Sequence, residues 1–223
     1  MPFHFLDIRR LAASCAILCA LFLQAPVLAA GPADAAAVID PDEIVFDRSQ
    51  AEWSQAYLQW VATFARTSSP VSDTSGAQCA AKQSGDVWFL ATSDGTAPVE
   101  RSCAVPVGKT LFVPVASVLE RSGSREPDCA AMARSASGNL QHVDALSLTI
   151  DGRAVDALRS YRQSSGGCFA LGTRQVPRVE AKTAVADGYY VMLRPLSAGA
   201  HTLVVGARFD SVDVATTYRL DVR

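Results

Sequence analysis

Two short apolar runs in the middle of the sequence predict the central strands of a β-sheet. They are residues 86–92 and 110–116, which are rich in Val, Phe, Trp and Leu and are bounded by Gly, Pro, Ser and Asp. Such residues favour strands, and a short apolar run is typical of a strand that is covered on one or both faces. The segment Gly85–Val115, which contains both runs, is therefore predicted to be the centre of the fold.

The connection between the two runs predicts a further strand. Asp94-Gly95 is a pair that supplies the positive φ angles of a tight hairpin, so residues 99–105 are expected to pair back on the first run. Residues 106–109 then form the next turn. Pro114 lies within the second run and predicts an edge position or a β-bulge there, because proline has no N–H to donate.

The clearest helix pattern follows Ser49, which has capping-box spacing to Glu52. Apolar residues at helical spacing form one stripe: Trp53, Tyr57, Trp60, Val61 and Phe64. An exposed aromatic stripe would suit carbohydrate or peptide binding, whereas a buried one belongs to the core. Stripes of this kind are more often core, so we expect the helix to pack across the sheet and to end before Pro70.

The remaining pattern is mostly that of strands. Pro127 and Asp128 precede good helix formers and predict a short surface helix at Cys129. Residues 143–150 alternate and end at Asp151-Gly152, residues 155–161 fit an edge strand or a short helix, and strands are expected at 188–193, 201–209 and 214–222. The fold class is therefore predicted to be mainly β: an antiparallel β-sandwich with an N-terminal amphipathic helix and a short second helix.

The N-terminal composition predicts export. Arg9 and Arg10 precede an apolar, Ala-rich run that ends before Gln24, and residues 26–29 read Pro-Val-Leu-Ala. This is typical of a signal peptide over residues 1–29, and the run is short of the roughly 20 residues of a membrane anchor. Residues 30–48 are expected to be a flexible leader in which order starts near residues 39–46, and residues 49–223 are expected to be a single disulfide-bonded β-rich domain, secreted or periplasmic.

Cysteine usage agrees with export. After signal removal the chain keeps Cys79, Cys103, Cys129 and Cys168, which suggests two disulfides with three possible connectivities. We favour Cys79–Cys103, which flanks the first apolar run, and Cys129–Cys168. No C-x-x-C spacing occurs among these four, which argues against a zinc site or a thioredoxin-like centre, and we expect no metal or cofactor.

The charge balance limits the classes of partner. The formal net charge is −2 for the whole chain and becomes −3 when Asp7, Arg9 and Arg10 leave with residues 1–29. A balanced, slightly acidic chain has no long-range field to attract nucleic acid or anionic membranes. The expected partner is an extracellular or envelope ligand, and the oligomeric state stays open.

Few residues can support catalysis. His142 forms an H-x-D pair with Asp144, which fits a surface pair better than a metal site because a closed zinc site needs four ligands. His201 stands at a strand entrance, where a ring nitrogen can bond to a turn carbonyl. Cys168 fits a disulfide better than a nucleophile, and no G-x-S-x-G motif occurs. The sequence predicts no catalytic residue, and the candidate ligand-binding residues are Trp53, Trp60, Trp88, His201 and Lys109.

Residues spread over about positions 50–223 form a pattern that is similar to one found in other proteins. They are Trp60, Pro70, Asp73, Gly76, Cys79, Gln83-x-Gly85, Val87-Trp88-Phe89-Leu90, Arg101-x-Cys103, Val105-Pro106-x-Gly108-Lys109, Leu111-Phe112-x-Pro114-Val115 and Pro195-Leu196-Ser197-x-Gly199-x-His201. With this pattern the chain resembles a group of exported bacterial proteins of unknown activity. The resemblance implies a secreted domain with a structural Cys79–Cys103 pair, and it brings no activity.

Two functions follow as hypotheses. The first is an exported, non-enzymatic binding or envelope-associated module, and the alternative is a secreted hydrolase that acts on glycans or peptides. Convergence of His142 or His201 with acids or serines in a cleft would favour the hydrolase. Solvent exposure of the tryptophans would favour ligand recognition by their rings.

Overall fold

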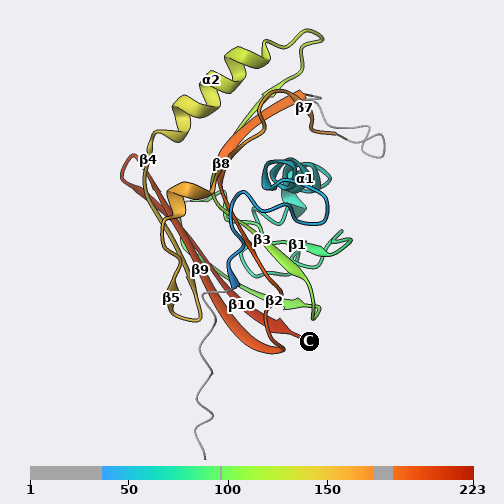
Figure 1. The fold of residues 1–223 in the computed structure, drawn as a ribbon, viewed down its shortest axis with the longest axis vertical. Helices are drawn as coiled ribbons and strands as arrows, with labels where there is room; N and C mark the ends of the chain where they lie inside the picture. Colours follow the sequence, from blue (N-terminus) through green and yellow to red (C-terminus); the bar gives the residue numbers. More distant parts are fainter. Residues whose placement is uncertain (1–36, 96, 173–182) are drawn as a thin grey trace, which may run out of the picture. The chain divides into compact units, whose positions relative to one another are not determined.

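The computed structural model describes residues 37–95, 97–172 and 183–223. The predicted signal peptide, residues 1–29, and residues 30–36 of the predicted leader lie outside the described part. Within that part the chain forms two β-sheets and two α-helices, which confirms the mainly β fold with a sandwich of two sheets (Figure 1). Among the described residues, no helix has the length and apolarity needed to cross a membrane.

The two sheets contain the following strands. The first sheet has the order β1 (Val87–Phe89), β3 (Thr110–Ser122), β8 (Thr183–Leu193) and β6 (Arg162–Ser164), and β7 (Phe169–Ala170) also pairs with β8. The second sheet has the order β2 (Val99–Val105), β10 (Val212–Val222), β9 (Gly199–Phe209), β4 (Val143–Ile150) and β5 (Arg153–Ala154). The helices are α1 (Gln50–Ala62) and α2 (Cys129–Leu140), with 3₁₀ turns η2 (Arg66–Ser68) and η3 (Leu158–Tyr161).

Most strand pairs are antiparallel, but the predicted hairpin between the first apolar run and residues 99–105 is wrong. β1 pairs in parallel with β3, and β2 lies in the other sheet, where it pairs in parallel with β10. Gly95 does not adopt a positive φ. The physical reason is the burial pattern: β1 is covered on both faces, whereas β2 alternates and suits a sheet with one solvent face.

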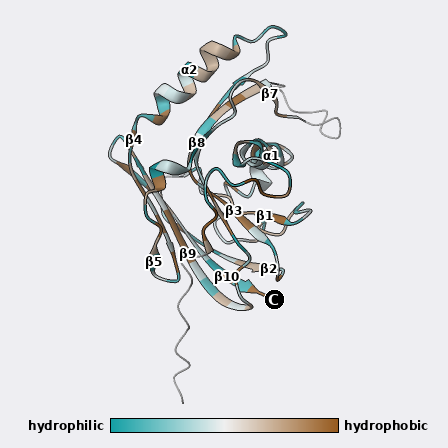
Figure 2. Cartoon of the chain, in the orientation of Figure 1, coloured by the Kyte–Doolittle hydropathy of each residue, from teal (hydrophilic) through white to brown (hydrophobic). Residues whose placement is uncertain are grey.

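Two apolar cores lie on opposite faces of the first sheet. Alternate residues of β8 divide between them: Tyr189, Val191 and Leu193 pack against the second sheet, and Tyr190 and Met192 pack toward α1. In Figure 2 the strands β9 and β10 change in hydropathy along their length. The first sheet is thus a middle layer between α1 and the second sheet, which explains why its strands form continuous apolar runs.

The sequence patterns at Ser49 and Pro114 predicted the start of α1 and an irregularity in β3, and both are present. The capping box is formed: the Ser49 hydroxyl accepts from the N–H of Glu52, whose carboxylate accepts from the N–H of Ser49 at 2.8 Å. Tyr57 and Trp60 are buried in the core under α1, which confirms the core assignment of the aromatic stripe. β3 has a register shift between Pro114 and Ala116, as the predicted bulge requires.

Gly188 in β8 is required by close packing and supports a prediction. A Cβ at Gly188 would lie 2.7 Å from the Ala116 carbonyl oxygen and 2.8 Å from both Ser117 Cβ and Tyr190 Cε2. Gly188→Ala is expected to lower the free energy of unfolding by about 1–3 kcal/mol through overpacking. The matched control is Gly138→Ala in α2, where a Cβ meets nothing within 4 Å. This control should stabilise by about 0.5–1 kcal/mol, and urea denaturation that shows equal effects at the two sites would contradict the prediction.

Candidate functional site

Three polar residues meet where the β4–β5 turn approaches the start of β9. Asp151 and Gly152 form this turn with φ angles of 50° and 79°, as the sequence predicts. One Asp151 oxygen accepts from the N–H of Thr202 at 2.7 Å, and the other lies 2.7 Å from His201 Nδ1. The Ser197 hydroxyl lies 3.3 Å from His201 Nε2. A serine, a histidine and an acid therefore converge, as in a hydrolase triad.

The contacts of His201 nevertheless suit a structural tie. Nε2 lies 2.9 Å from the Ser197 carbonyl oxygen, closer than it lies to the hydroxyl. A carbonyl oxygen only accepts hydrogen bonds, so in the tautomer with hydrogen on Nε2 this nitrogen donates to the Ser197 carbonyl and has no lone pair for the serine proton. His201 thus bonds to a turn carbonyl, as expected, and links the turn before β9 to the β4–β5 turn.

The second histidine lies at the opposite end of β4. His142 Nδ1 is 2.9 Å from Asp210 Oδ1, and both side chains are exposed. Asp144, the other member of the H-x-D pair, instead accepts from the N–H of Ser211 at 3.4 Å. The described residues include no group of three or more His, Cys, Asp or Glu that could hold a metal ion. His142 and Asp144 therefore bind Asp210 and Ser211 and hold the β9–β10 turn against the start of β4.

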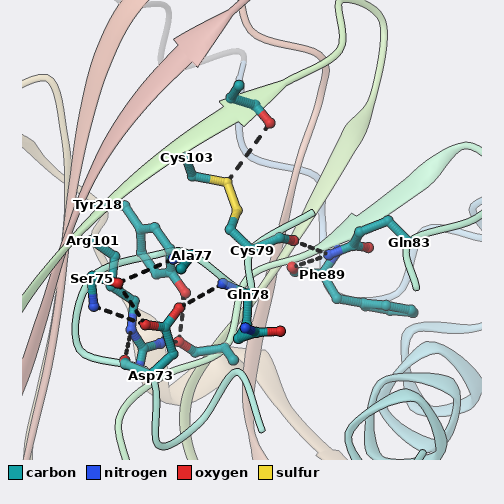
Figure 3. The surroundings of a disulfide bond; sticks show 12 residues. Asp73, Ser75, Ala77, Gln78, Cys79, Gln83, Phe89, Arg101, Cys103 and Tyr218 are labelled. Carbon is teal, nitrogen blue, oxygen red and sulfur yellow. Dashed lines mark hydrogen bonds between the residues drawn. A yellow bond between two sulfur atoms is a disulfide. The ribbon is translucent and has the colours of Figure 1, made fainter. Parts of the chain in front are cut away.

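A buried arginine, which sequence reasoning missed as a site residue, organises the surroundings of the first disulfide (Figure 3). Arg101 in β2 is 1% exposed. Its guanidinium donates to the carbonyls of Asp73 at 2.7 Å, Val71 at 3.0 Å and Ala91, and to the Tyr218 hydroxyl at 3.0 Å. The period-2 pattern of residues 99–105, which puts Arg101 on the same face as Cys103, was the signal that could have revealed it.

Asp73 and Tyr218 complete this cluster. The Asp73 carboxylate accepts from the N–H groups of Ser75 at 2.9 Å and Gln78 at 2.8 Å. Burial raises the pKa of Asp73, but these hydrogen bonds outweigh burial and leave the pKa below its usual value. Burial also raises the pKa of Tyr218, whose hydroxyl donates to the Ala91 carbonyl at 2.6 Å. The adjoining recess is too narrow for a water molecule, so the cluster is a support and not a ligand pocket.

Both predicted disulfides are present. Cys79–Cys103 joins the loop before β1 to β2, with Cα atoms 5.8 Å apart, and Cys129–Cys168 joins the start of α2 to the residue before β7, with Cα atoms 5.3 Å apart. The Ser102 N–H donates to the Ser75 carbonyl at 2.9 Å beside the first disulfide. The loop before β1 therefore covers the free edge of β2.

The other candidate ligand-binding residues are engaged within the domain. Trp60 and Trp88 are each 7% exposed, so their rings cannot form the exposed platform considered from the sequence. Trp53 is half-buried, and its Nε1 donates to the Val45 carbonyl at 2.8 Å. Lys109 Nζ donates to the Gly85 carbonyl at 2.5 Å and lies 3.9 Å from Asp86 Oδ1. Lys109 thus ties the β2–β3 turn to the start of β1.

An exposed apolar turn lies in the segment that was predicted to be a flexible leader. Order was expected to start near residues 39–46, and this part is hydrogen-bonded: Ile39 N–H donates to the Met192 carbonyl at 2.9 Å, and Val45 and Arg48 exchange backbone hydrogen bonds of 2.9 and 3.2 Å. We call residues 44–47 the Ile44–Phe46 turn, after its two exposed apolar residues. Ile44 is 61% exposed and Phe46 is 52% exposed, whereas Val45 between them is buried.

Comparisons with known proteins give only remote similarity. No protein-family model and no curated protein matches the sequence. One similar solved structure is described as PbICP-C in complex with falcipain-2, with 10% identity, a TM-score of 0.29 and coverage of 62% of this chain and 100% of that chain. Another is the solution structure of Amebosin, with 10% identity, a TM-score of 0.19 and coverage of 56% and 96%. Both TM-scores are low, and neither similarity supports the conclusions below.

Proposed function

We propose that this domain is an exported, non-enzymatic binding module that presents side chains from a rigid, disulfide-bonded frame. The observation that carries the proposal is the Ile44–Phe46 turn, where two large apolar side chains face solvent although the backbone around them is hydrogen-bonded. Two of the four exposed large apolar side chains among the described residues lie in this one turn, and exposed apolar side chains that occur together mark interaction sites. The two disulfides support export, because such bonds persist in oxidising compartments.

The test is cross-linking of the full, C-terminally tagged chain in its native envelope. We expect a discrete complex of the tagged chain with one other component, lost when the protein is reduced and unfolded before cross-linking. Recovery of the uncomplexed chain alone, at cross-linker concentrations that capture a known envelope complex, would contradict a binding role.

A secreted hydrolase is the second candidate, favoured by the meeting of Ser197, His201 and Asp151. We expect a fluorophosphonate probe, which reacts with activated serines, to label the wild type no more than Ser197→Ala. The physical reason is that the Ser197 hydroxyl lies 3.3 Å from His201 Nε2, longer than the bond between a nucleophile and its base, whereas the Ser197 carbonyl lies closer, at 2.9 Å. Stoichiometric labelling of the folded wild type that Ser197→Ala abolishes would replace the binding proposal with the hydrolase.

A further inference from the structure

We infer that the Ile44–Phe46 turn is the surface that contacts the partner, and that this partner is a protein with an apolar pocket bordered by Lys or Arg. The inference rests on the binding function proposed above and goes beyond it by naming the surface and the chemistry of the partner. Three observations carry it: the backbone conformation of Phe46, the rigidity of the turn, and the acidic residues around it.

The conformation of Phe46 costs free energy that burial of its side chain offsets only in part. Phe46 and Asp47 have φ angles of 49° and 60°, in the left-handed region. Two-residue turns of this kind favour Asn, Asp or Gly, and a bulky residue with positive φ is rare. Burial of the ring could offset the cost, but Phe46 is 52% exposed. Strain that is maintained although half of the side chain faces solvent points to a use for that side chain outside the domain.

The turn is held on several sides, so it is preorganised for binding. Trp53 Nε1 donates to the Val45 carbonyl, and Arg48 lies over the Trp53 ring, 4.9 Å from its centroid. Before the turn, the Glu43 carboxylate accepts two hydrogen bonds from Arg194, at 3.1 and 2.8 Å. An aromatic side chain on an ordered turn loses little conformational entropy when it enters a pocket.

Acidic residues near the turn indicate the charge of the partner. Asp40, Asp42 and Asp47 are exposed, and the structure places none of them in an ion pair among the described residues. Carboxylates around an apolar centre complement a pocket bordered by Lys or Arg. They also disfavour an anionic lipid surface, and in a symmetric contact with a second copy of the chain they would face each other. A different, basic protein is therefore the occupant that fits.

The first test measures the strain. Phe46→Asn places a residue that tolerates positive φ in the same turn, and we expect the melting temperature to rise by about 2–4 °C. The matched control is Val212→Asn, because Val212 is also exposed, at 45%, beside a turn but has no positive φ. The control should not raise the melting temperature. An unchanged or lower value for Phe46→Asn would overturn the inference.

The second test measures the contact with the partner. The photoreactive residue p-benzoylphenylalanine replaces Phe46 or, as the control, Val212 in the full chain within its native envelope. We expect an adduct with another protein from position 46 only, mapped to a peptide with Lys or Arg beside apolar residues. Ile44→Ser and Asp42→Lys, each combined with the photoreactive residue at position 46, should lower the adduct yield about tenfold, which corresponds to 1.4 kcal/mol of binding free energy.

The other outcomes separate the inference from the proposed function. If the wild type forms its complex but Phe46→Asn forms it equally well, the binding role stands and this surface is wrong. If the adduct is a second copy of the chain, or if the turn binds anionic lipid vesicles, the predicted partner is wrong. If the wild type forms no complex at all, both proposals fail.

Discussion

Replacing Arg101 with methionine is expected to lower the free energy of unfolding by about 3–5 kcal/mol, because a hydrogen bond to a charged group contributes about 1.5–3 kcal/mol and the buried guanidinium makes several. The loss arises because methionine removes the guanidinium's hydrogen bonds to the carbonyls of Asp73, Val71 and Ala91. The Val71 carbonyl keeps the N–H of Asp94 and the Ala91 carbonyl keeps the Tyr218 hydroxyl, so the Asp73 carbonyl is the acceptor that loses most. Urea denaturation followed by tryptophan fluorescence measures the change.

Arg219→Met is the matched control for this prediction. Arg219 lies on β10, is exposed, and pairs with Glu100 at 3.1 Å on the solvent face of the same sheet. An exposed ion pair contributes about 0–1 kcal/mol, so the control should change stability little. Arg101→Lys should fall between the two, since one ammonium cannot reach all the acceptors of the planar guanidinium. If the Arg101 and Arg219 variants have equal stability, the supporting role of Arg101 is wrong.

The second large effect is expected for loss of the first disulfide. Cys79→Ala with Cys103→Ala opens a loop with a sequence separation of 24 residues. Loop-closure entropy alone gives a loss of about 3.5 kcal/mol. A further effect follows from the structure, because the loop that contains Cys79 covers the free edge of β2 and carries Asp73 and Val71, which bind Arg101. Uncovered strand edges promote association, so the variant should also aggregate.

The second disulfide supplies the control for edge protection. Cys129→Ala with Cys168→Ala opens a longer loop, of separation 39, and loop entropy alone predicts a loss of about 4 kcal/mol. We expect this variant to stay monomeric in size-exclusion chromatography at concentrations where the Cys79/Cys103 variant associates. Equal association of the two variants would show that covering the β2 edge is not the decisive contribution of Cys79–Cys103.

The sequence predicted those parts of the fold that depend on neighbours close in the chain. The capping box at Ser49 and Glu52, the turn at Asp151-Gly152 and the bulge at Pro114 all depend on a few adjacent residues. Strand pairing was harder to predict. The alternation of β2 indicates that one face meets solvent, but it does not indicate which strand lies beside it, and the pairing with β10 involves residues more than 100 positions away.

In the candidate sites, too, contacts between residues close in sequence were predicted and contacts between distant residues were not. His201 was predicted to bond to a turn carbonyl because Ser197 lies only four residues before it. Its second partner, Asp151, lies 50 residues away and was not predicted. The Ile44–Phe46 turn was assigned to the leader, where order was expected to start near residues 39–46. Its contacts, from Trp53 to Val45 and from Arg194 to Glu43, join distant segments and were not predicted.

By itself, the sequence determined both α-helices, most of the long strands, the pairing partners favoured for four cysteines and the mainly β class, because periodicity, capping and turn chemistry act over a few residues. It did not predict the short strands β5, β6 and β7 or the first residues of β8. Only the tertiary structure decided that Arg101 is buried, that Trp60 and Trp88 are unavailable to a ligand, and that Phe46 faces solvent in a strained turn. The physical reason is that burial and exposure depend on which distant segments cover a side chain. That coverage exists only once the two sheets and α1 have packed together.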